Sequence, residues 1–253
     1  MKGISTYISE KLKITTAQKY HIYFPENDKE LRSLIGEIIS KDGNEADLNS
    51  INTSKVSNMR ELFADYPDFN GEISEWDTSN LISTSDMFDV CKNFNCDISN
   101  WNVSNVINMS YMFFGCKSFN QDLSKWDVSR VTRMEYMFRA CEKFNGDISG
   151  WNVIKVKDMA FMFKSCKSFN QDISGWNVSN VENMSNMFCR CTEFNQNLSD
   201  WDVSNVVNME FMFNGCANFD QDLSKWNWNT KKAKSKSNMF DCTKCKKYPL
   251  WAL

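Results

Sequence analysis

The residues best suited to chemistry are ten cysteines and one histidine. Cys242 and Cys245 have the C-x-x-C spacing of zinc and redox sites, but a structural zinc needs four ligands, and neither a second such pair nor a pair of histidines accompanies them. His21 has no serine or cysteine nucleophile motif beside it. The sequence therefore predicts a protein that is not an enzyme, holds no metal and needs no cofactor.

Six of the cysteines belong to a repeat, which favours a structural role for them. A buried cysteine behaves as a small hydrophobic residue, and we expect these thiols to be reduced because no secretory signal is visible. One tryptophan and two phenylalanines recur in every unit with the same period. The sequence therefore predicts a tandem array with cysteines at Cys91, Cys116, Cys141, Cys166, Cys191 and Cys216, and tryptophans at Trp76, Trp101, Trp126, Trp151, Trp176, Trp201 and Trp226.

Each unit has two halves with different apolar periods. Trp101 and Val103 alternate with polar residues, which indicates a short strand. The apolar residues from Val106 to Cys116 follow at spacings of three and four, which is typical of a helix or of successive 3₁₀ turns. A unit this short must stack on its neighbours to bury its apolar side chains. The predicted fold is an α/β repeat, a right-handed solenoid with one parallel sheet and short helical segments on the opposite side.

The repeat pattern divides the chain into three regions. Residues 51–228 form the predicted array, which begins with a degraded unit in which Ile51 replaces tryptophan. Residues 1–50 are rich in charge and contain an apolar stripe over residues 29–41, which predicts an N-terminal capping region of strand and helix. Residues 229–253 break the pattern and are predicted to be an irregular C-terminal cap.

An asparagine recurs in the loop that returns each unit to the next. Asparagine suits turns because its side chain bonds nearby backbone groups. We expect these side chains to form a ladder that satisfies loop backbone from unit to unit. The members are Asn70, Asn95, Asn120, Asn145, Asn170 and Asn195.

The residues that flank the predicted strand are the first candidate binding site. Their side chains should point away from the core, because neighbours on a strand alternate faces. We predict that this sheet face receives a partner, although regular polar ladders can also simply satisfy one another. The predicted binding residues are Glu75, Asp77, Asn100, Asn102, Lys125, Asp127, Asn152, Asn177, Asp200, Asp202 and Lys225.

The predicted helical side is the second candidate binding face. Exposed tyrosine, phenylalanine and arginine are enriched at interaction hot spots, while some of these side chains can instead pack between units. The residues are Tyr111, Phe114, Tyr136, Arg139, Phe161, Lys164, Asn186, Arg190, Phe211 and Asn214.

Charge and hydropathy exclude other kinds of partner. A formal net charge of −3 argues against nucleic-acid binding, which usually requires a basic surface. No stretch approaches the roughly 18 apolar residues that cross a bilayer, so we expect no membrane-spanning segment. The first residues contain no apolar run of the kind found in signal peptides, which favours a cytoplasmic location. The lysine-rich run over residues 231–236 is interpreted as a solvated loop.

One motif carries a family resemblance. It reads Phe-Asn-Gln-Asp-Leu/Ile-Ser-x-Trp-Asn/Asp-Val-Ser-Asn-Val-x-Asn-Met-x-x-Met-Phe, as at residues 119–138 and 169–188, and recurs through most of the chain. It resembles the BspA-like leucine-rich-repeat surface proteins. The resemblance implies a leucine-rich-repeat-like solenoid, an association with bacterial surfaces, and a role in adhesion or protein interaction, with no catalytic residues to carry over.

Together these observations predict a non-enzymatic interaction or adhesion module. Its partner would be a protein or a surface glycan, and we expect a monomer. A purely structural, self-assembling solenoid is the alternative, although divergent ends of the array argue against open-ended assembly. An enzyme or a metal-binding protein is the third reading, for which only His21 and the Cys242/Cys245 pair offer material.

Overall fold

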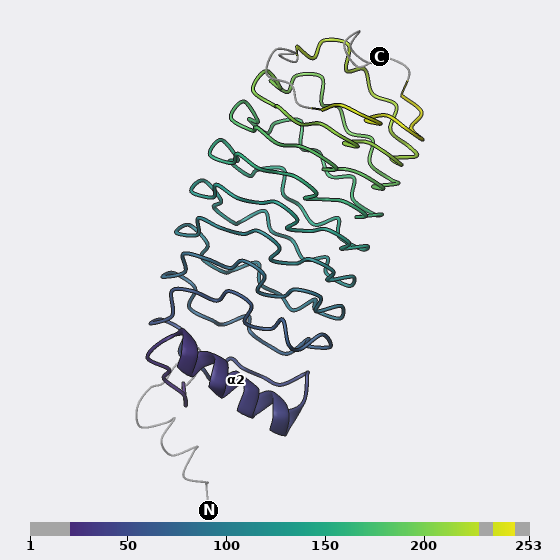
Figure 1. The fold of residues 1–253 in the computed structure, drawn as a ribbon. Helices are drawn as coiled ribbons and strands as arrows, with labels where there is room; N and C mark the ends of the chain where they lie inside the picture. Colours follow the sequence, from purple (N-terminus) through teal and green to yellow (C-terminus); the bar gives the residue numbers. More distant parts are fainter. Residues whose placement is uncertain (1–20, 228–234, 246–253) are drawn as a thin grey trace, which may run out of the picture.

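The protein is a stack of 25-residue units with one helix at its N-terminal end (Figure 1). The computed structural model describes residues 21–227 and 235–245. Over these residues it contains one α-helix, α2 (Asp28–Asp42), and no strand. Neighbouring units are joined by isolated parallel bridges between equivalent residues, such as Asn108 with Arg133 and Arg133 with Asp158.

The predicted sheet and the predicted helical segments are both wrong for the described residues. The bridges lie at Asn108 and its equivalents, inside the segment that was predicted to be helical. The segment around Trp101 and Val103 is not a strand and lies between turns. The run from His21 to Phe24 is also not a strand and makes a single bridge, from Tyr23 to Ile51. The chain is therefore not an α/β array with a parallel sheet.

Alternating hydrogen bonds explain why the segment from Met109 to Cys116 is neither strand nor helix. The amides of Met109, Tyr111 and Phe113 donate to carbonyls of the next unit at 2.9–3.1 Å. Between them, the amide of Ser110 donates to the Asn108 side chain, and the amide of Met112 donates to the carbonyl of Met109 three residues back. Tyr111 has a φ of 58°, a left-handed conformation that neither a helix nor a strand contains. The apolar period of three and four therefore comes from linked turns.

The apparent strand has a similar explanation. The amide of Trp101 donates to the carbonyl of Ile98, and that of Val106 donates to Val103, so the chain turns every few residues. Between these turns the Asn102 side chain accepts a bond from the amide of Ser104 at 3.1 Å. Buried apolar residues then alternate with exposed polar ones, although these residues belong to no strand.

Helix α2 lies where the apolar stripe predicted a helix. The Asn27 side chain caps its first turn by accepting bonds from the amides of Lys29 and Glu30, and Gly43, with a φ of 85°, ends it. Its buried face consists of Leu31, Ile35 and Ile39. From the same helix Arg32 donates to the carbonyls of Arg60 and Glu61 in the first unit at 2.6 and 2.7 Å. The helix thus contacts the unit beside it through both its core and its polar surface.

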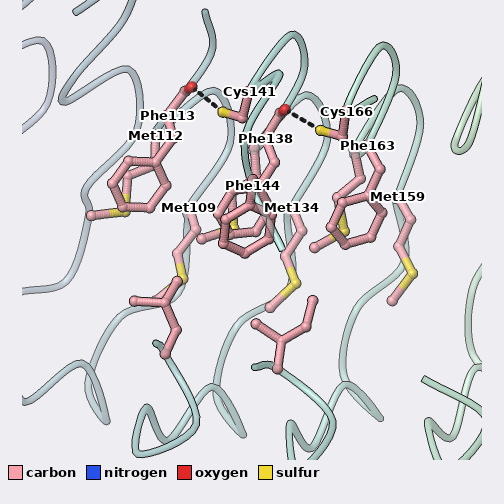
Figure 2. Packing of buried hydrophobic residues seen from close by; sticks show 14 of the residues in the cluster. Met109, Met112, Phe113, Met134, Phe138, Cys141, Phe144, Met159, Phe163 and Cys166 are labelled. Atoms are coloured by element: carbon pink, nitrogen blue, oxygen red, sulfur yellow. Dashed lines mark hydrogen bonds between the residues drawn. The ribbon is translucent and has the colours of Figure 1, made fainter. Parts of the chain in front are cut away.

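The core is a set of parallel columns of identical side chains. Phe113, Phe138 and Phe163 stack with ring centroids 5.5 and 5.7 Å apart, and methionine side chains lie beside these rings (Figure 2). All of these rings are fully buried. Because each unit completes the core of its neighbour, the hydrophobic interior continues from α2 to the last described unit.

The units are closer together on one side of the stack than on the other. Equivalent rings are 4.4 Å apart at Tyr111 and Tyr136, 5.5 Å at Phe113 and Phe138, and 6.4 Å at Trp126 and Trp151. We call the close side, equivalent to residues 107–118 of one unit, the ladder side, because backbone amides there bond directly to neighbouring units. The wider side, equivalent to residues 119–131, is the bridging side.

On the bridging side, side chains make most of the bonds between units. The indole N–H of Trp126 donates to the carbonyl of Ile98 at 3.1 Å, and every repeat tryptophan makes the equivalent bond. The predicted asparagine ladder is confirmed, since the Asn120 side chain accepts from the amide of Asn145 at 2.7 Å and the same bond recurs along the array. The side chains of these residues are therefore part of the framework.

Candidate functional site

One column on the ladder side has a left-handed backbone in every unit. Its φ angles fall between 54° and 62°. Glycine and asparagine adopt this conformation at least cost, whereas a bulky side chain in it is uncommon. Its members are Glu61, Asp86, Tyr111, Tyr136, Phe161, Asn186, Phe211 and Asn238. The architecture requires the conformation, but nothing in the backbone requires aromatic residues there.

Three consecutive members of this column form a stack of aromatic rings. Tyr111 lies 4.4 Å from Tyr136, and Tyr136 lies 4.5 Å from Phe161, with interplanar angles of 7° and 8°. Phe114 lies beside Tyr111 at 5.9 Å. All four side chains are partly exposed. Each ring face inside the stack is thus covered by the next ring, and the ring edges face the solvent.

Two cations lie over these rings. The Arg139 guanidinium lies 5.1 Å from the ring centroid of Phe114, 5.5 Å from that of Tyr136 and 5.8 Å from that of Phe161. The Lys164 ammonium lies 5.1 Å from the Phe161 ring. These are cation–π distances. We call the set Tyr111, Phe114, Tyr136, Arg139, Phe161 and Lys164 the aromatic ridge.

A third cation, Arg190, lies near the ridge. Arg190 directly follows Cys189, which occupies the same column as Arg139 and Lys164. Burial raises the pKa of the Cys189 thiol, and the positive charges of Lys164, Arg190 and Arg139 oppose that rise. Within residues 21–227 and 235–245, none of these three cations forms an ion pair with a carboxylate. The surface therefore carries a concentrated positive charge that the described chain leaves unneutralised.

The same columns become acidic toward the N-terminal end. Asp86 and Glu61 take the place of the tyrosines, and Asp89 takes the place of Phe114 and Arg139. Burial raises the pKa of Asp89, and the charges of Asp86 and Glu61 raise it further. Burial also raises the pKa of Asp86, against the influence of Arg60. The ladder side thus changes from acidic to aromatic and then to basic along the stack.

The residues of the first candidate site are all exposed, and several are occupied in local turns. The carboxylate of Asp127 accepts a bond from the amide of Ser129 at 3.0 Å, and bonds from Ser129 lower the pKa of Asp127. Lys125 donates to the Asn100 side chain at 3.1 Å. Because the described part of the chain forms no sheet, these residues line turn corners on the bridging side. The set comprises Glu75, Asp77, Asn100, Asn102, Lys125, Asp127, Asn152, Asn177, Asp200, Asp202 and Lys225.

The residues of the second candidate face fall into adjacent columns on the ladder side. These positions could be predicted from the sequence, because their residue types vary among otherwise similar units. The left-handed backbone conformation of Tyr111 and Tyr136 could not be predicted from the sequence. The same holds for the position of Arg139 near three aromatic rings, since both features depend on how the turns are linked between units.

The repeated cysteines are buried thiols that bond to backbone. Cys141 and Cys166 donate to the carbonyl oxygens of Phe113 and Phe138 at 2.9 and 2.7 Å, as Figure 2 shows. All ten cysteines are free, and burial raises the pKa of Cys91 to about 12. A thiol that stays protonated is a poor nucleophile and a poor metal ligand, so this column contributes structure.

The other candidates, which include the Cys242/Cys245 pair, do not gather reactive or metal-binding side chains among the described residues. Cys242 is exposed, whereas Cys245 is buried and donates to the carbonyl of Gln221 at 3.2 Å. Among the described residues, no three His, Cys, Asp or Glu side chains converge as metal ligands, and no helix is long and apolar enough to span a bilayer. An open depression of about 380 Å³ lies beside Lys157, Glu182 and Val207 but gathers no reactive set. The predicted lysine-rich loop, apart from Lys236, lies outside the described residues.

The repeat units match a known protein family. The family is described as Mycoplasma protein of unknown function, DUF285, and its matches cover residues 32–149, 97–196 and 171–250. The chain belongs to this family. No curated protein and no solved structure matches it significantly. The three overlapping matches within DUF285 agree with a tandem repeat.

Proposed function

We propose that this member of DUF285 is a non-enzymatic protein-binding module and that its binding surface is the aromatic ridge. The observation that carries the proposal is the presence of Tyr111, Tyr136 and Phe161 in a left-handed column. Asn186 and Asn238 occupy the same column and suit that conformation better. Aromatic residues that persist at unfavourable backbone positions on a surface are best explained by a gain outside the fold.

The composition of the ridge supports the same function. Tyrosine and arginine are among the residues enriched at the centres of protein interfaces, where a few side chains provide most of the binding energy. Here two tyrosines, two phenylalanines and Arg139 lie within one continuous cluster. Stacking limits the motion of these side chains in the free protein, which lowers the entropy cost of binding.

A protein fits this surface better than a neutral glycan. Sugar rings bind aromatic residues by lying against an exposed ring face. In the ridge, the faces of Tyr136 are covered by Tyr111 and Phe161, and Arg139 lies over the same group. Ring edges and cationic groups remain available, and these suit the mixed apolar and charged surface of a protein.

The resemblance to BspA-like surface proteins also supports an interaction role. That family is generally taken to act in adhesion or protein interaction, and the shared motif extends over most of this chain. We therefore propose interaction with a protein at a surface as the biological context. The repeated motif lies mostly on the bridging side, so the resemblance concerns the framework and leaves the specificity to the ladder side.

The test is affinity capture of partner proteins with matched variants. Tyr136→Asn with Phe161→Asn removes two rings and introduces the residue that the chain itself uses at Asn186. Lys125→Glu with Lys225→Glu changes charge on the bridging side and is the control. We expect the ridge variant to lose the captured partner and the control to keep it. Loss in the control alone would contradict the proposal and favour the first candidate site.

A further inference from the structure

The positive charge around the aromatic ridge points to the chemistry of its partner. Arg139 and Lys164 are fixed over ring faces, and neither they nor Arg190 forms an ion pair with a carboxylate within the described chain. A guanidinium that lies beside aromatic rings and forms no ion pair keeps N–H donors for a ligand, and those donors match the two oxygens of a carboxylate.

We infer that the ridge binds an acidic polypeptide segment whose carboxylates meet Arg139, Lys164 and Arg190 while its apolar side chains contact the ring edges. This inference rests on the proposed function and specifies the partner. The three cations come from three successive units, so the segment runs along the stack and crosses the units one after another.

The surroundings favour an acidic peptide over a nucleic acid. The formal net charge of the chain is −3, and Asp86 and Asp89 lie in the same columns as the ridge, three units before Lys164. A phosphodiester chain needs a long basic track, because its affinity comes from many neutralised phosphates. Three cations beside an acidic end instead suit a short segment with a few carboxylates.

The acidic end sets the direction of the segment. Burial raises the pKa of both Asp86 and Asp89, and the negative charges of Asp86 and Glu61 raise the pKa of Asp89 further, so another carboxylate beside Asp89 would be repelled. The carboxylates of the partner should therefore lie over Arg139, Lys164 and Arg190, and its neutral or basic residues over Asp86 and Asp89.

The chain provides matched variants for this test. Arg139→Asn with Lys164→Asn removes both ring-bound cations and keeps the aromatic stack, since Asn214 occupies the equivalent position in a later unit. Asp86→Asn with Asp89→Asn removes the acidic end, and Asn186 and Asn214 are the equivalent residues. Lys125→Glu with Lys225→Glu is the charge control on the bridging side. Circular dichroism and thermal melting establish that each variant is folded.

The measurement is fluorescence anisotropy with a labelled twelve-residue peptide of alternating glutamate and leucine. We expect it to bind the unaltered protein, to lose roughly tenfold in affinity with Arg139→Asn/Lys164→Asn, and to gain a few-fold with Asp86→Asn/Asp89→Asn, as expected when about two partly exposed ion pairs are removed or one repulsion is relieved. The bridging-side control should bind as the unaltered protein does.

Three results would overturn the inference. The first is equal or absent binding of the glutamate peptide to the unaltered protein and to Arg139→Asn/Lys164→Asn. The second is tighter binding of a lysine–leucine peptide or an oligothymidylate of the same length. The third is a dimer of the chain that dissociates in Arg139→Asn/Lys164→Asn, which would make a second copy the occupant. If partner capture still depends on Tyr136 and Phe161 after any of these results, the proposed function stands and only the partner chemistry fails.

Discussion

The ladder side and the bridging side hold neighbouring units together by different means, and this difference explains where the sequence varies. On the ladder side backbone amides make the bonds, so a residue such as Tyr136 can change without loss of a bond between units. On the bridging side Trp126 and Asn120 make the bonds with their side chains. Their positions repeat because the fold needs those atoms. Where backbone atoms make the bonds between units, as on the ladder side, side chains can vary for binding without loss of those bonds.

Alkaline pH should produce the largest change in stability. Burial raises the pKa of the Cys91 thiol from 9.0 to about 12, so the folded state keeps a proton that the unfolded state loses above pH 9. The stabilisation is complete below pH 9 and declines as the pH rises toward 12, by roughly 1.4 kcal/mol per pH unit for each such thiol.

Urea unfolding at pH 8, 9 and 10 measures this effect, with Cys91→Ala as the control. Lysines and tyrosines also titrate in this range, so the difference between the two proteins isolates the thiol. The variant should lose less stability per pH unit. Equal slopes would contradict the view that the thiol is buried and protonated.

Loss of one tryptophan N–H should be the next largest effect. Trp151→Phe leaves the buried carbonyl of Leu123 without its donor and leaves a small cavity, and it should lower the free energy of unfolding by about 2–4 kcal/mol. On the ladder side, Tyr136→Asn should change the free energy of unfolding by about 1 kcal/mol or less, because relief of the left-handed backbone strain offsets the lost ring contacts. Chemical denaturation measures both, and similar losses in the two variants would remove the distinction between the sides.

The asparagine ladder should give the smallest effect. Asn145→Ala removes the oxygen that accepts from the amide of Asn170 at 2.9 Å and should cost about 1 kcal/mol, since the site is exposed and water replaces part of the bond. Asn145→Asp keeps an accepting oxygen and should cost less. If the two substitutions cost the same, the oxygen is not what joins these units.

The sequence predicted those features that depend on repeated side chains. It identified the 25-residue period, the asparagine ladder and the helix near residues 28–42, because stacked units place like residues together and because the apolar residues over 29–41 recur at helical spacing. It failed on the sheet because the alternation of Trp101 and Val103 with polar residues arises from turns as readily as from a strand.

The binding surface was only partly predictable for the same reason. Variation among units indicated both candidate faces, but the left-handed backbone at Tyr111, Tyr136 and Phe161 cannot be read from residue types that usually avoid it. The stacking of Arg139 on rings from three units also depends on the spacing between units. The predicted role of Glu75, Lys125 and the other bridging-side residues stays a prediction.

Site-specific photo-crosslinking tests the central claim most directly. A photoreactive phenylalanine analogue would be placed at position 136 in one protein and at position 127 in another, which puts one probe on each side of the stack. We expect the partner to crosslink efficiently from position 136 and weakly from position 127. Strong crosslinking from position 127 with none from position 136 would contradict this expectation and would move the binding surface to the bridging side.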